Sequence, residues 1–288
     1  MSDLIGTPLP TLTAHDALLA TFARGSYNSD FQPPANSGFE RLAVTLRDNN
    51  GNLYVPSSGF SAQAWINKSN GEIVVAYTGS DDWEDFIGAD TAALNGRWHP
   101  QFDDAGRFAV AARNAAGEIL NPLGKQPTLI VTGHSLGGML AQVVSRLTGA
   151  EGRGFDAPGV LALTQTPGFG ALARSLGEPE NGYTINEQQF VSFQTGLVGS
   201  LGDAPVGGQA SILALNDPSL TPFLVGVGLG LLNPVLGFSA WVGGSAILDT
   251  HGMTGIERAV YGLAALHPVG QSKAPTFGQV KSPHLKST

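Results

Sequence analysis

The sequence predicts an α/β protein in which a mixed, mainly parallel central sheet is flanked by helices. Near its start, two pairs of β-patterned segments are joined by Asn/Gly-rich turns, which favours antiparallel hairpins. Further along, β-branched apolar runs alternate with alanine- and leucine-rich helical stretches, which is typical of parallel strands joined by helices. Residues 73–77 are apolar throughout, as expected of a strand buried on both faces.

The expected elements can be placed in chain order. Helices are expected at residues 15–24, 102–116, 139–147 and 171–176. Strands are expected at residues 41–46, 53–55, 61–67, 72–77, 129–132, 189–195 and 211–215. The 288 residues suit a single α/β domain, so we expect one domain over residues 1–288.

One segment departs from this alternation. Residues 218–248 contain no charged side chain and many large apolar ones, interrupted by glycines and three prolines. These interruptions make a poor transmembrane helix, so no stable membrane insertion is expected. The segment is expected to be either a buried helical hairpin or an exposed apolar flap over the site.

The composition excludes several classes of protein. Hydrophobic residues make up 42% and charged residues 13%, which excludes a disordered chain. The net charge is −8 and no Lys/Arg cluster occurs, which argues against nucleic acid and anionic lipid head groups as partners. The absence of cysteine excludes disulfides and thiolate metal sites, and neither a metal nor another cofactor is expected. Nothing in the sequence predicts an oligomeric state.

Residues 1–10 lack the basic and apolar regions of a cleavable secretory signal. The expected localisation is therefore cytoplasmic, or exported by a route that needs no such signal.

The most informative stretch is residues 127–140. It places Gly133-His134-Ser135-Leu136-Gly137 between an apolar, β-branched run and a helix-forming stretch. Strand, Gly-x-Ser-x-Gly and helix form a nucleophile elbow, whose strained turn presents the serine clear of the backbone. We expect Ser135 to attack an acyl carbon and the Leu136 amide to donate to the developing oxyanion.

A second oxyanion donor is expected from a loop after an early central strand. The loop that follows residues 73–77 occupies that place, and Ser80 within it offers both an amide and a hydroxyl.

A serine nucleophile needs a base, and in the α/β-hydrolase arrangement the acid and then the histidine follow the serine along the chain. His251, His267 and His284 follow Ser135. His284 lies in a polar, basic tail and His267 precedes a proline, whereas His251 lies between an apolar run and a helical pattern. We expect His251 to be the base, and His134 within the elbow to pack rather than react.

The acid that orients the imidazole of the base has several candidates in the sequence. Asp203, in the loop after the strand at 189–195, is the first choice, and Asp217, which closes the strand at 211–215, is the second. Asp156, beside the elbow, and Asp249, next to the histidine, stay open as alternatives, as does the absence of such an acid.

Four landmarks together resemble the class 3 lipase family, the fungal triacylglycerol-lipase type with bacterial relatives. They are Thr78-Gly79-Ser80 with Asp82-Trp83 after an apolar strand, His99-Pro100-Gln101-Phe102, the Gly133–Gly138 elbow, and Phe155-Asp156-Ala157-Pro158-Gly159. The resemblance implies an α/β-hydrolase fold and carboxylic-ester hydrolysis through an acyl-enzyme, with Ser135 as nucleophile and Ser80 and Leu136 as oxyanion donors.

The sequence departs from this family at two positions. Thr78 stands where the family usually has arginine, and Gly196 stands where it usually has the acid. The apolar 218–248 segment favours lipid-like esters, so the expected function is a lipase or esterase. A non-catalytic lipid-binding protein on the same fold is the alternative, and thioester or polyester hydrolysis is open to the same machinery.

Overall fold

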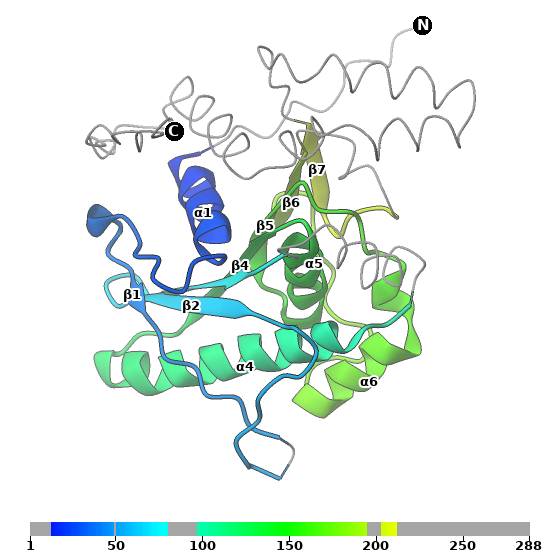
Figure 1. Ribbon diagram of the computed structural model, residues 1–288, viewed down its shortest axis with the longest axis horizontal. Helices are drawn as coiled ribbons and strands as arrows, with labels where there is room; N and C mark the ends of the chain where they lie inside the picture. Colours follow the sequence, from blue (N-terminus) through cyan, green and yellow to red (C-terminus); the bar gives the residue numbers. More distant parts are fainter. Residues whose placement is uncertain (1–12, 49, 80–96, 195–202, 212–288) are drawn as a thin grey trace, which may run out of the picture.

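The computed structural model describes residues 13–48, 50–79, 97–194 and 203–211, and among them a seven-stranded sheet forms the centre of the protein (Figure 1). Its strands lie in chain order: β1 (Glu40–Arg41), β2 (Ala62–Asn67), β3 (Glu72–Tyr77), β4 (Thr128–His134), β5 (Glu151–Phe155), β6 (Phe190–Gln194) and β7 (Gly208–Ser211). β1, β2 and β3 pair antiparallel, and every later neighbour pairs parallel. The predicted mixed, mainly parallel α/β sheet is confirmed.

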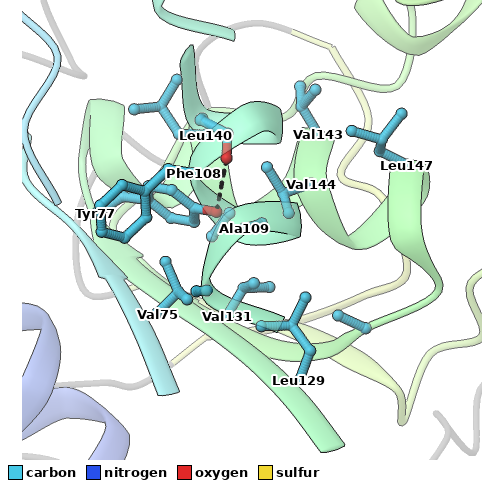
Figure 2. Close-up of a cluster of buried hydrophobic side chains, with 14 of the residues drawn as sticks. Val75, Tyr77, Phe108, Ala109, Leu129, Val131, Leu140, Val143, Val144 and Leu147 are labelled. Carbon is cyan, nitrogen blue, oxygen red and sulfur yellow. Dashed lines mark hydrogen bonds between the residues drawn. The ribbon is translucent and has the colours of Figure 1, made fainter. Parts of the chain in front are cut away.

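Helices cover both faces of this sheet (Figure 1). They are α1 (Ala14–Gly25), α4 (Pro100–Leu120), α5 (Leu136–Thr148) and α6 (Pro167–Leu176), with short 3-10 turns at η1 (Ala35–Ser37), η3 (Asn121–Leu123) and η4 (Leu163–Gln165). α1 packs on one face, where Phe22 clusters with Val74 and Ile130. α4 and α5 pack on the other, where they enclose Val75 and Val131 (Figure 2).

β3 shows why its sequence is apolar throughout. Val74 and Ala76 face α1, whereas Val75 and Tyr77 face α4 and α5, so both sides of the strand are buried. The Tyr77 hydroxyl donates to the carbonyl of Ala105 in α4 at 3.2 Å (Figure 2). Burial raises the pKa of the Tyr77 phenol well above its ordinary value, so the group stays a neutral donor.

α1 begins at a capping box. The Thr13 hydroxyl accepts from the Asp16 amide at 3.1 Å, while the Asp16 carboxylate accepts from the Thr13 amide at 2.8 Å. The same carboxylate, almost fully buried, pairs with the Arg153 guanidinium of β5 at 2.5 Å. One carboxylate therefore both caps α1 and ties it to the sheet.

The four predicted helices and the second hairpin are confirmed, with small changes in bounds. The first hairpin is only partly right. Its turn forms around Asp48, whose carboxylate accepts from the Asn50 and Asn52 amides at 2.8 Å. Beyond the turn, however, the pairing is limited to an isolated bridge between Arg47 and Leu53 and a hydrogen bond from the Tyr54 amide to the Leu46 carbonyl at 3.0 Å. The hairpin projects from the sheet instead of extending it (Figure 1).

β7 spans Gly208–Ser211, so it begins before the last predicted strand, 211–215, of which residues 212–215 lie outside the described residues. No helix in the described part of the chain is both long and apolar enough to cross a membrane. The apolar 218–248 segment lies outside the described residues, and the single domain over 1–288 stays a prediction.

Candidate active site

Ser135 occupies a strained turn between β4 and α5. Its backbone has φ 55° and ψ −126°, a conformation that side-chain-bearing residues rarely adopt, and the residue is 3% exposed. Such strain costs about 1–3 kcal/mol and gathers at functional sites. A methyl group built on Gly133 would overlap the Gly137 carbonyl group, and one on Gly137 would overlap the carbonyl of Tyr77. Both elbow glycines are therefore required by close backbone approach.

The beginning of α5 supplies the electrostatics of this turn. The Ser135 carbonyl accepts from the amides of Gly138 at 2.9 Å and Met139 at 3.1 Å, which starts the helix. Leu136 is the first helical residue, so its amide has no acceptor within the helix and lies at the positive end of the helix dipole. This is the position that an oxyanion donor requires.

The end of β3 lies directly against the elbow. A methyl group built on Gly79 would lie 2.7 Å from the His134 carbonyl oxygen and 3.4 Å from the Ser135 Cβ atom. Ser80, the predicted second donor, is the next residue but lies outside the described part. The loop that carries Ser80 therefore starts beside Ser135.

Thr78 stands at the family's arginine position and has its own anchor. Its hydroxyl donates to the Ser26 carbonyl at 2.9 Å, and its amide donates to the Ser61 carbonyl at 3.0 Å. A short hydroxyl-bearing side chain thus ties the start of the loop that carries Ser80 to the segment after α1. Sequence reasoning missed this contact, since it depends on residues about 50 positions apart.

Asp203, the first choice for the acid, lies in the loop before β7. The residue is exposed, and its carboxylate accepts from the Ala162 amide at 2.5 Å, just before η4. Its backbone bridges to Gly159 in the loop after β5. Asp217 and Asp249 lie outside the described residues, and so does the predicted base, His251.

Asp156 differs from Asp203 in burial and in backbone conformation. It follows β5 directly, is 1% exposed and has φ 43°. Its amide donates to the Phe193 carbonyl of β6 at 2.8 Å. The histidine of the elbow, His134, lies on the α1 side, where its Nδ1 atom is 3.0 Å from the Tyr27 hydroxyl.

Two buried amide side chains fix the loops around the site, and sequence reasoning missed both. Gln142 of α5 donates to the Pro158 carbonyl at 2.8 Å and accepts from the Val206 amide at 3.1 Å. Gln194 of β6 donates to the Ala157 carbonyl at 2.9 Å. The one sequence signal that could have revealed Gln142 is its place within a mainly apolar helical stretch.

Within the described ranges, no group of three or more His, Asp or Glu side chains is placed to hold a metal.

The chain is similar in sequence to known phospholipases. Residues 18–195 match the Tle-like phospholipase domain family. The chain belongs to this family. It is also 32% identical over 153 residues to the extracellular phospholipase A1 of Serratia liquefaciens, a match that covers 52% of this chain and 44% of that protein. The chain thus spans less than half of that relative.

Solved structures similar to this phospholipase-like chain include two fungal lipases. The Lip2 lipase of Yarrowia lipolytica is 16% identical with a TM-score of 0.38, over 68% of this chain and 77% of the lipase. The Rhizomucor miehei lipase propeptide complex is 16% identical with a TM-score of 0.42, over 68% and 66% of the two chains. The family match and the strand–elbow–helix arrangement on a mainly parallel sheet confirm the predicted α/β-hydrolase type.

Proposed function

We propose that this protein is a serine carboxylic-ester hydrolase that acts on lipid esters through an acyl-enzyme. The observation that carries the proposal is the strained Ser135 turn at the start of α5. Membership of a phospholipase domain family supports a lipid substrate, and so does the similarity to a protein described as an extracellular phospholipase A1.

In the proposed reaction, the Ser135 hydroxyl oxygen attacks the ester carbonyl carbon while the base takes the hydroxyl proton. The tetrahedral oxyanion accepts hydrogen bonds from the Leu136 amide and from Ser80. The intermediate collapses, the carbon–oxygen bond to the alcohol breaks, and the base returns the proton to the alcohol. Water then cleaves the acyl-enzyme by the same two steps and releases the fatty acid.

His251 is the proposed base, on the chain-order argument alone. For the acid, Asp203 stays the prediction made from the sequence, with Asp217, Asp156 and Asp249 as the alternatives. The reaction as proposed needs neither a metal nor a cofactor.

The experiment is the substitution Ser135→Ala, assayed on a p-nitrophenyl ester and on a short-chain diacyl phospholipid. We expect turnover to fall by about 10⁴–10⁶-fold, since the nucleophile is lost. The matched control is Ser175→Ala, at an exposed serine on α6 whose hydroxyl donates to the Leu172 carbonyl at 2.7 Å. A Ser135→Ala variant with near-normal turnover would overturn the proposal.

Two further readouts of the same assay separate the alternatives. A fluorophosphonate probe should label Ser135, and failure to label the folded protein would favour a non-catalytic lipid-binding protein. Turnover of the phospholipid should rise when its concentration passes the micellisation point. A rate without such a rise would indicate a plain esterase.

A further inference from the structure

Asp156 is a buried carboxylate one strand away from Ser135, at the same edge of the sheet. His134 and Phe155 pair in register on the parallel strands β4 and β5. Ser135 and Asp156 are therefore the next residues along these two strands. Neighbouring strands lie about 4.8 Å apart, so the two residues leave the sheet side by side.

Ser135 and Asp156 share an unusual backbone conformation. Among the described residues, Ser135 with φ 55° and Asp156 with φ 43° are the two non-glycine residues with positive φ. Aspartate tolerates the left-handed region better than most side chains, yet a glycine would adopt it freely. Strained backbone of this kind persists where the surrounding structure holds it, commonly at functional sites.

The surroundings hold the Asp156 segment from both sides. The Ser135 amide donates to the Phe155 carbonyl at 3.0 Å, and the Asp156 amide donates to Phe193 at 2.8 Å. Beyond it, Gln194 holds the Ala157 carbonyl at 2.9 Å and Gln142 holds the Pro158 carbonyl at 2.8 Å. This segment is therefore preorganised against the elbow.

Asp203 lacks these properties. It is exposed, and its carboxylate accepts from the Ala162 amide at 2.5 Å, just before η4. A carboxylate stabilises an imidazolium most strongly where water is excluded, because the effective dielectric is low there. Burial therefore favours Asp156 over Asp203 for this task.

We propose that Asp156 is the positioning residue that orients the general-base imidazole and stabilises its protonated form. The inference rests on the proposed function and replaces Asp203 as the acid. The carboxylate accepts a hydrogen bond from one ring N–H and leaves the other ring nitrogen to take the Ser135 hydroxyl proton. Of the other charged and titratable groups on β4 and β5, Arg153 pairs with Asp16, His134 contacts Tyr27, and Glu151 is exposed at the start of β5.

Two substitutions at this position, Asp156→Asn and Asp156→Gly, test the inference. Both residue types accept a φ near 43°, so the fold should survive, as checked by circular dichroism and thermal melting. We expect kcat to fall by about 10³–10⁴-fold while KM changes little. The acid limb of the kcat/KM profile should move to lower pH, because the imidazole loses the carboxylate that raises its pKa.

The matched control is Asp104→Asn, at another buried carboxylate, which lies on α4. Its removal should lower stability and leave the acid limb in place. Wild-type kcat and an unmoved acid limb in folded Asp156→Asn would overturn the inference, as would an acid limb moved by Asp203→Asn instead.

If the Asp156 variants do not fold, proton NMR of the Asp203→Asn variant tests the inference instead. The low-field proton resonance of a carboxylate-bound imidazole should persist in Asp203→Asn, and its loss there would contradict the inference. Failure of the proposed function would look different, since Ser135 of the wild-type protein would then not react with the fluorophosphonate probe.

Discussion

The elbow edge (residues 133–139 and 155–158) is held together by different means from the hairpin segment (residues 42–60). At the elbow edge, backbone approaches backbone so closely that a methyl group on Gly137 would overlap a carbonyl group. In the hairpin segment, Gly51 faces open space, and Leu53 and Val55 are 74% and 84% exposed. Substitutions should therefore have very different effects in the two regions.

The hairpin segment is anchored by side chains. The hydroxyls of Tyr54 and Ser58 donate to the Asp104 carboxylate of α4 at 2.6 and 2.5 Å. The hydrogen bond to Asp104 raises the pKa of the Tyr54 phenol, which therefore stays a donor. Replacing either hydroxyl-bearing residue of the hairpin segment removes one hydrogen bond. Replacing an elbow glycine instead forces two backbone segments apart.

The largest effect is expected from Gly137→Ala at the elbow edge. Helix propensity alone predicts a gain of about 1 kcal/mol, because alanine is the better helix former. The overlap with the Tyr77 carbonyl predicts instead a loss of about 3 kcal/mol in the free energy of unfolding. Urea denaturation measures this, with Gly117→Ala as the control, at a helical glycine of α4 that has room for a methyl group. Stabilisation in both variants would refute the close-approach argument.

A smaller loss, about 2 kcal/mol, is expected for Gln142→Met. The substitution keeps the volume but leaves the Pro158 carbonyl and the Val206 amide unpaired in the interior. Gln188→Met, at an exposed glutamine, should stay within about 0.5 kcal/mol. Equal denaturation midpoints for the two variants would show that Gln142 does not hold these loops.

The smallest effect is expected in the hairpin segment. Tyr54→Phe removes one hydroxyl donor to Asp104 and should lower the free energy of unfolding by about 1 kcal/mol. The control is Tyr183→Phe, at an exposed tyrosine whose hydroxyl lies 3.2 Å from Glu178. A Tyr54→Phe loss as large as that of Gly137→Ala would remove the contrast between the two regions.

The sequence predicted the elements whose signals are local. The Asn70-Gly71 turn, the apolar run at 73–77 and the strand–elbow–helix pattern each depend on neighbouring residues, and all are present as predicted. The prediction of the first hairpin was only partly right: its turn depends on neighbouring residues and is present, but its two arms pair as an isolated bridge instead of as strands of the sheet. Ser80 and His251 stay predictions.

The sequence alone was enough to predict the strained Ser135 turn and the kind of sheet that carries it, since glycine spacing and apolar periodicity act over a few residues. The tertiary structure alone decided the environment of each carboxylate. Asp156 and Asp203 look alike in the sequence, but strand register buries the first beside Ser135, while a loop leaves the second exposed at the Ala162 amide. Burial controls the strength of a charge interaction, because the effective dielectric is lower away from water. Burial itself depends on contacts between residues that are distant in the chain.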